Sequence, residues 1–207
     1  MLLIVPWFSI VASAQAYEGT MQYDKKKQRA IVIDYSYPAQ AVENAIVKRM
    51  EKLGYKPKEE KGLLNRDKGF LVYKNAFVTD INSDKMDYMI KVERKSRKED
   101  DASVLYVIMN KDGINAMDQM DASGVDKAKS FLNNMMPDIE AANLELQIKA
   151  QEELIAKAEK KLRGLKDDQA SLEKKLQDNK TDQENTQKDI ENQKQALGTL
   201  IGKRKSN

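Results

Sequence analysis

The sequence of 207 residues contains no cysteine and no histidine. These absences exclude disulfide frameworks, thiolate or imidazole zinc sites, Cys–His dyads and Ser–His–Asp triads, which leaves carboxylates, lysines, hydroxyls and backbone groups for any chemistry. Aromatic residues make up only 6% of the chain, and none follows Phe131. The 36 basic and 33 acidic side chains leave a net charge of only +3, so no nucleic-acid partner is expected.

The first 16 residues carry no charged side chain, and residues 2–11 form an apolar run. That run is too short for a helix to span a hydrocarbon core of about 30 Å. Ala14 and Ala16 follow it in the A-x-A arrangement behind which signal peptidase cleaves. We therefore expect residues 1–16 to be a signal peptide, cleaved after Ala16, and the mature protein to be periplasmic or secreted. No later run reaches spanning length, so no transmembrane segment is expected after cleavage.

The chain after the expected cleavage site divides into two unlike parts. All of its aromatic residues lie between Tyr17 and Phe131. Residues 138–207 instead carry 14 basic and 14 acidic side chains. A segment that lacks aromatic residues and is rich in charge cannot close a globular core by itself. We therefore predict a folded domain over residues 17–137 and a helical extension over residues 138–207.

Strand and helix patterns alternate within residues 17–137. Residues 30–35 read as a strand, with Ile31, Ile33 and Tyr35 on one face and Val32 and Asp34 on the other, and a helix is predicted from Pro38 to Gly54. The other patterns are strands at 70–73, 87–94 and 103–109, a weak strand at 55–60 that Pro57 interrupts, and a helix marked by Val125, Ala128, Leu132 and Met135. Because residues 103–109 are apolar on both faces, we expect them to form a central strand. The fold class predicted is α+β: a small antiparallel sheet with helices packed on one face, followed by a long C-terminal coiled-coil helix or helical hairpin.

Two features resemble known families. The strand and helix of residues 30–46 resemble the opening of helix-grip domains, which bind lipids and sterols, and this resemblance implies a ligand cavity. The whole chain resembles the uncharacterised secreted bacterial proteins that join a small α+β domain to a charged coiled coil. This second resemblance rests on the order of the segments and implies no activity.

Carboxylate patterns are the remaining candidates for chemistry. A partial calcium-loop pattern places side-chain oxygens at alternate positions, at Asp80, Asn82, Asp84 and Asp87. Lys85 and Lys91 stand where an EF-hand loop has its turn glycine and its bidentate glutamate, so we expect an ordinary polar loop and no metal site. Pairs such as Asp118 and Asp121 are expected by chance among 33 acidic residues. We predict neither enzymatic activity nor a cofactor.

The strongest pattern is a heptad repeat that keeps one register from Ala141 to Arg204. Ten of its a and d positions carry large apolar side chains, which we call the seam: Leu144, Ile148, Ile155, Leu162, Leu165, Leu172, Leu176, Ile190, Leu197 and Leu200. Polar residues occupy the a and d positions from Asn179 to Thr186. Nine heptads in one register predict a coiled coil, with the seam as its interaction surface.

The charges beside the seam indicate how the coiled coil pairs. A parallel, in-register dimer would bring like charges together in three places, at Lys161 and Lys166, Asp168 and Glu173, and Lys175 and Lys180. A hairpin folded within residues 179–182 instead sets apolar layers against apolar layers. Asn179 and the capping box Thr181-x-x-Glu184 also favour a turn there. We therefore favour an antiparallel hairpin with its tip near Thr181, and a tip near Asp168 or a continuous rod remains an alternative.

Together these patterns predict a non-enzymatic, extracytoplasmic structural or interaction protein. Its coiled coil would brace the α+β domain or bind a partner, either another protein or a second copy of the chain. The alternative, from a different class, is a small-molecule or lipid-binding module that uses the space between the sheet and the helices.

Overall fold

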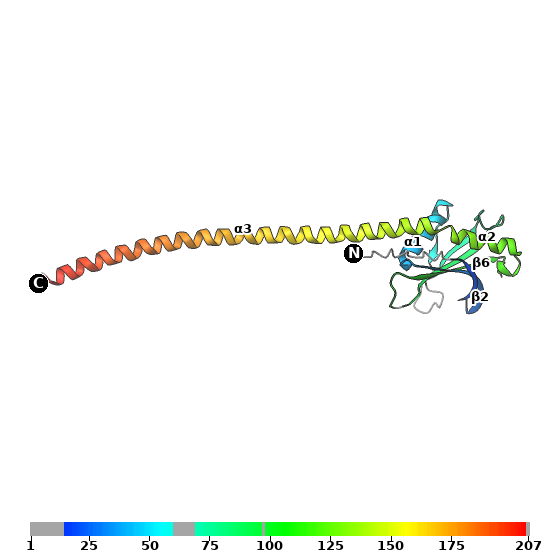
Figure 1. The fold of residues 1–207 in the computed structure, drawn as a ribbon. Coiled ribbons are helices and arrows are strands. Elements are labelled where there is room, and N and C mark those ends of the chain that lie inside the picture. The colour runs from blue at the N-terminus through cyan, green and yellow to red at the C-terminus, as the bar shows by residue number, and fades with distance from the viewer. Residues whose placement is uncertain (1–14, 60–68, 97, 206–207) are drawn as a thin grey trace, which may run out of the picture. The chain divides into compact units, whose positions relative to one another are not determined.

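The computed structural model describes residues 15–59, 69–96 and 98–205. The expected signal peptide lies outside these residues except for its last two positions. The chain forms two compact units, of which the first ends at Ile148 and the second begins at Lys149. Its elements are β1 (Tyr17–Tyr23), β2 (Lys26–Tyr35), α1 (Ala39–Lys52), β3 (Lys58–Glu59), β4 (Leu71–Ala76), β5 (Met86–Arg94), β6 (Ser103–Lys111), β7 (Ile114–Asn115), the short 3₁₀ turn η1 (Ala116–Asp118), α2 (Ala122–Asn133) and α3 (Met136–Lys205), shown in Figure 1.

The strands of the first unit form one antiparallel sheet. Their order is β1-β2-β6-β5-β4-β3, and β7 pairs with β6. The strand β6 lies between β2 and β5, which confirms the central position predicted from its two apolar faces. The register places Ile33 of β2 and Val92 of β5 on either side of Leu105. Three apolar side chains therefore meet on one face of the sheet.

The helix α1 begins and ends where the sequence predicts. Pro38 precedes its first residue, where the missing N–H of proline leaves no hydrogen bond unmade. Gly54 follows the C-cap residue with a φ of +89°, a left-handed conformation that favours glycine. Between these ends, Val42, Ile46 and Met50 are buried at helical spacing. The apolar stripe of α1 packs against the sheet.

The main core lies between one face of the sheet and the helices. Ile31, Ile33 and Tyr35 of β2 contribute to it from the sheet, and Phe131 and Leu132 contribute from α2. The Tyr35 hydroxyl donates a hydrogen bond of 2.7 Å to the Leu132 carbonyl oxygen, which joins β2 to the end of α2. The structure therefore has the α+β arrangement that was predicted, with helices on one face of an antiparallel sheet.

The first turns of α3 belong to this core, which places the end of the first unit later than expected. We predicted the domain to end at residue 137, whereas the first unit runs to Ile148. Ile139 is fully buried among the core residues, and Ala142 packs against them. The composition of residues 138–207 obscures this because two apolar side chains are few among so many charges.

A second apolar cluster lies on the opposite face of the sheet. Its buried members are Ala30, Val32, Phe70, Val72, Met89 and Ile108, with Met21, Tyr23, Val104 and Tyr106 packed against them. The rings of Tyr23 and Phe70 meet edge to face, with their centroids 4.9 Å apart. Each face of β6 contributes to a different apolar cluster, and this explains why both faces of the strand are apolar.

Candidate functional site

The second unit consists of the part of α3 that begins at Lys149. Every side chain from Lys149 to Lys203 is exposed. The ten seam residues, two of them in the first unit, are between 42% and 65% exposed. Isolated helices in water gain little from propensity alone, and most helices are stabilised by packing of an apolar face. An apolar stripe of this length on an exposed helix is therefore the strongest candidate for an interaction surface.

The spacing of the seam indicates what kind of surface it is. A straight α-helix has 3.6 residues per turn, so a strict seven-residue repeat stays on one side only when helices supercoil around a partner. Two hollows on α3 have the composition of coiled-coil holes. One of about 490 Å³ is lined by Leu165, Asp168, Gln169, Leu172, Glu173 and Leu176, and one of about 450 Å³ by Thr186, Asp189, Ile190, Gln193, Lys194 and Leu197. Each set is drawn only from a, d, e and g positions, which form the holes that accept a partner's side chains.

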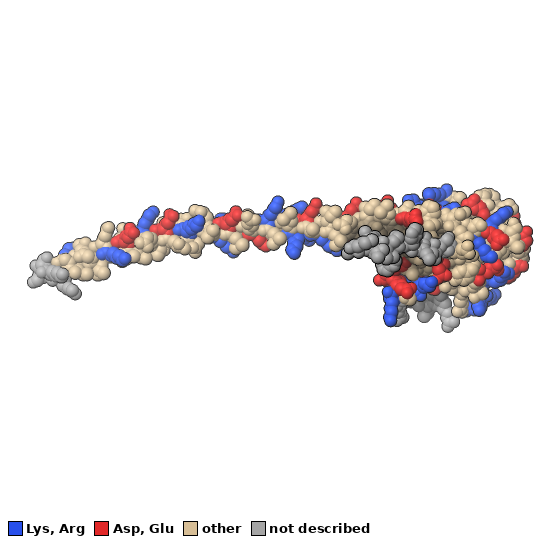
Figure 2. All heavy atoms as spheres, in the orientation of Figure 1, with Lys and Arg blue, Asp and Glu red and all other residues tan. Residues whose placement is uncertain are grey.

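Charged and amide side chains cover the rest of α3. Figure 2 shows basic and acidic side chains interspersed along the helix. Hydrogen bonds between residues four apart support it, such as those from Gln169 to Glu173 at 2.8 Å and from Gln187 to Glu191 at 3.3 Å. These contacts lie within α3 itself and leave the seam residues exposed.

The predicted hairpin is wrong, because α3 is a single helix through residues 179–182. The reason lies in the side chains that were expected to form the turn. The Thr181 hydroxyl donates a hydrogen bond of 3.1 Å to the Gln177 carbonyl oxygen, one turn earlier, and so does not act as a cap. The Asn179 side chain accepts a hydrogen bond of 2.7 Å from the Gln183 side chain. Both polar residues are satisfied inside a continuous helix, so nothing local requires a turn, and a tip near Asp168 is excluded in the same way.

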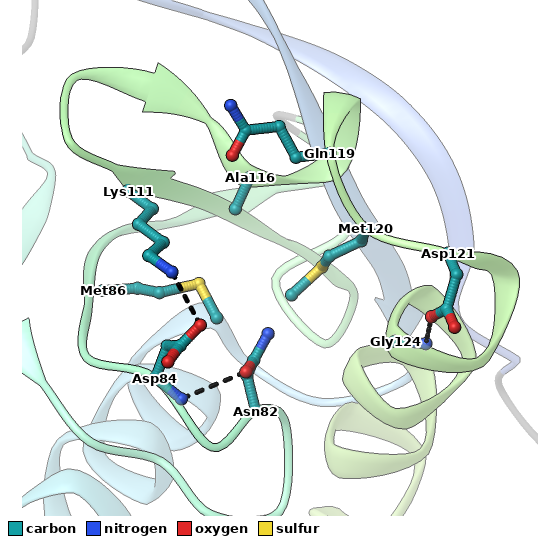
Figure 3. A pocket seen from close by; sticks show the side chains of 9 residues that line it. All are labelled: Asn82, Asp84, Met86, Lys111, Ala116, Gln119, Met120, Asp121 and Gly124. Carbon is teal, nitrogen blue, oxygen red and sulfur yellow. Dashed lines mark hydrogen bonds and ion pairs between the residues drawn. The ribbon is translucent and has the colours of Figure 1, made fainter.

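The first unit carries a polar pocket of about 410 Å³ (Figure 3). Its lining includes Asp84, Lys111 and Asp121. Lys111 and Asp84 form an ion pair of 2.7 Å, and the hydrogen bond to Asp84 raises the pKa of the Lys111 ammonium. The Asp121 carboxylate accepts a hydrogen bond of 2.8 Å from the Gly124 amide and caps α2. The charged groups of this pocket are thus already paired with each other or used to cap a helix.

The four residues of the partial calcium loop each contact a different partner and do not converge on one centre. Asp80 approaches Arg49 at 3.8 Å, Asp84 pairs with Lys111, and Asp87 accepts a hydrogen bond from the Asn75 amide. Asn82 accepts a hydrogen bond from the Asp84 amide, as in an ordinary polar turn. In residues 15–59, 69–96 and 98–205 no cluster of three or more metal-ligating side chains is found.

Asp118 and Asp121, the carboxylate pair noted in the sequence, also have separate partners. Asp118 forms an ion pair with Arg29 at 3.2 Å, whereas Asp121 caps α2. Arg29 also contacts Glu18 at 2.9 Å, and hydrogen bonds from Arg29 and Lys129 lower the pKa of the Glu18 carboxyl. This ionic cluster ties β1 and β2 to η1 and α2. It is a structural contact that sequence spacing alone did not reveal.

Among the described residues, no helix combines the length and the apolar character needed to cross a membrane. Comparisons of the chain with protein-family models, with curated proteins and with solved structures found no match.

Proposed function

We propose that this chain is a non-enzymatic, extracytoplasmic interaction protein that binds its partner through the seam of α3. The observation that carries this proposal is the exposure of the seam, in which ten Leu and Ile side chains remain between 42% and 65% accessible. Fully burying one such side chain contributes about 1.5–3 kcal/mol, so covering the seam offers a large gain in free energy. A helix that only carried charge at its surface would not place Leu or Ile at so many a and d positions.

The alternative ligand-binding function draws less support. The described helices and sheet fill the interior between them with side chains such as Val42, Ile46 and Met109, each of which is fully buried. The polar pocket of the first unit contains ion pairs and a helix cap rather than unpaired groups aimed at a ligand. The seam is therefore the better supported site.

The proposed location outside the cytoplasm rests on the N-terminal sequence. Among the described residues the first strand, β1, begins at Tyr17, the residue that follows the expected cleavage site. The apolar run and the A-x-A residues before it fit a signal peptide. We expect protein isolated from its native host to be recovered outside the cytoplasm with Tyr17 as its first residue. Cytoplasmic protein that still begins with Met1 would contradict this part of the proposal.

The interaction is tested with a pair of matched double variants of the full chain, examined by chemical crosslinking in intact native cells. Leu165→Asp with Leu172→Asp places two charges in the seam, and Ala170→Asp with Gln177→Asp places the same charges at b positions on the outer side of the same helix. The seam variant should lose the crosslinked species formed by the wild type, because charged a and d residues cannot be buried unpaired.

The outer-face variant should keep those species, since b positions stay in solvent in a coiled coil. Near-ultraviolet circular dichroism of tyrosine on both purified variants checks that the α+β unit has remained folded, because no tyrosine follows Tyr106. Equal crosslinking by the two variants, or by the seam variant and the wild type, would overturn the proposed function.

A further inference from the structure

Polar residues interrupt the seam at six a or d positions, and these positions restrict how a partner helix can align with the seam. Six a or d positions between residues 151 and 193 are polar: Gln151, Gln169, Asn179, Gln183, Thr186 and Gln193. In the described helix all six are exposed, as the seam residues are. Polar residues in a coiled-coil core lower stability but select one register and one partner arrangement. Any helix that packs on the seam must place a hydrogen-bonding side chain opposite each of these polar residues.

We infer that the partner is a second copy of this chain, bound in parallel and in register. This inference rests on the proposed function of the seam. In that arrangement every layer pairs a residue with itself, so Gln169 meets Gln169, Asn179 meets Asn179, and the other polar residues do likewise. Amide side chains both donate and accept hydrogen bonds, so like pairs can satisfy each other. The apolar layers match in the same way.

Other parallel registers lose this match. A shift by one heptad sets Leu162 opposite Gln169, Leu172 opposite Asn179, and Leu176 opposite Gln183. Each of these layers would bury an amide against a leucine side chain, and an amide without a partner is costly to bury. The polar residues therefore act against slippage.

An antiparallel pair of chains buries less of the seam. Matches centred on Lys160 or on Thr181 each give three distinct layers of Leu or Ile, which for the Thr181 match are Leu162 with Leu200, Leu165 with Leu197, and Leu172 with Ile190. Each layer occurs twice, which makes six apolar layers in the pair. The parallel arrangement has eight over residues 155–200 alone, and it also avoids the mixed layer of Leu176 with Thr186.

The like charges that favoured a hairpin do not outweigh this difference. The parallel register sets Lys161 near Lys166 of the second copy, with two further like-charge contacts and one attractive contact between Asp189 and Lys194. These side chains are exposed in α3 and remain at the edge of a coiled coil, where charge pairs are weak and screened by salt. Burial of one apolar layer outweighs one such contact several-fold. The charges tune the strength of the dimer, while the layers determine its arrangement.

The test uses single cysteine variants of the full chain, which has no other cysteine. Leu165→Cys and Gln193→Cys lie at d positions, and Lys174→Cys lies at an f position on the outer face. In a parallel, in-register dimer the two copies of a d residue face each other within reach of a disulfide, whereas f residues do not. After mild oxidation we expect both d variants to run as covalent dimers on a non-reducing gel and Lys174→Cys to remain monomeric. Sedimentation of the wild-type chain should give the mass of a dimer.

Two results would overturn the inference. Covalent dimers that form only when Leu165→Cys is mixed with Leu197→Cys would show an antiparallel pair, which would reject the register and leave the seam as an interaction surface. A wild-type chain that sediments as a monomer at every concentration, with no crosslinking of the d variants, would reject a second copy as the partner. In that case the matched seam and outer-face variants in cells still decide the proposed function separately.

Discussion

Arg49 of α1 and Asp138 of α3 form an ion pair of 3.0 Å at the junction where α3 leaves α2. The guanidinium also donates a hydrogen bond of 3.2 Å to the Asn134 carbonyl oxygen, and it lies over the Phe131 ring at 4.8 Å from the centroid. The Arg49 side chain is only 22% exposed, which screens it partly from water. Arg49 thus connects α1 to the end of α2 and to the start of α3.

Arg49→Ala should therefore destabilise the first unit, by about 1–2 kcal/mol, because the change removes an ion pair, a hydrogen bond and a cation–π contact that are partly shielded from water. The control is Arg94→Ala, which removes an ion pair of 2.9 Å to Asp100 whose side chains are 66% and 78% exposed. That change should stay within about 0.5 kcal/mol of the wild type. Urea unfolding followed by the near-ultraviolet circular dichroism of tyrosine reports on this unit, since no tyrosine follows Tyr106. Equal losses in the two variants would contradict the role given to Arg49.

Local patterns in the sequence predict most of the first unit. The helix from Pro38 to Gly54 has three signals in agreement, an N-terminal proline, an apolar stripe and a terminal glycine, and it forms as α1. Local periodicity does not predict β1, an edge strand on which no residue is fully buried. Its position depends on pairing with β2 and on the ionic cluster around Arg29, which are long-range contacts. Pairing of this kind leaves little mark on local periodicity.

The heptad spacing predicts the ten seam residues, and the structure shows that all ten are exposed on one continuous helix. Their use as an interaction surface stays a prediction. The hairpin was predicted from residues that cap helices, and Thr181 instead donates its hydrogen bond within an unbroken helix. A capping residue permits a helix end but does not impose one, since its hydroxyl can also bond to the preceding turn.

Two glycines should respond to alanine in opposite directions. A Cβ on Gly19 would lie 2.7 Å from Cγ2 of Val32, a buried side chain of the neighbouring strand, whereas a Cβ on Gly164 would meet nothing within 4 Å. Gly19→Ala should destabilise the first unit by about 1–3 kcal/mol, because Val32 has little room to move. Gly164→Ala should stabilise α3 by about 0.5–1 kcal/mol through its higher helix propensity. Thermal unfolding followed at 222 nm measures both, and changes of the same sign would contradict the structure.

Three tyrosines should make the first unit sensitive to alkali. Burial raises the pKa of the Tyr35, Tyr73 and Tyr88 hydroxyls. Their folded-state pKa values lie above the value of about 10 in the unfolded chain, so the unfolded state loses protons first as the pH rises. Stability contributed by these neutral tyrosines is therefore complete below about pH 10 and falls above it. Urea titrations between pH 8 and pH 11 should show this loss, with tyrosinate absorbance near 295 nm rising together with unfolding.

The control for this loss is the double variant Tyr73→Phe with Tyr88→Phe. The hydroxyls of both residues are buried without a hydrogen-bond partner among the described residues, so removing them should leave the fold intact. The variant should lose less stability than the wild type between pH 10 and pH 11. An identical decline in the two proteins would show that other groups cause the alkaline sensitivity.

The strength of the proposed dimer should depend on the like charges beside its seam, and Glu173 separates the possible arrangements. In the parallel, in-register dimer Asp168 of each copy lies near Glu173 of the other, so Glu173→Lys turns two repulsive contacts into attractive ones. The dimer dissociation constant at low salt should fall by about tenfold, and high salt should reduce the difference. Glu191→Lys is the matched control, because Glu191 also accepts a hydrogen bond from the glutamine four residues earlier but lies at a b position. In an antiparallel dimer centred on Thr181, Glu173 would instead face Gln187, and sedimentation equilibrium would show no tightening specific to Glu173→Lys.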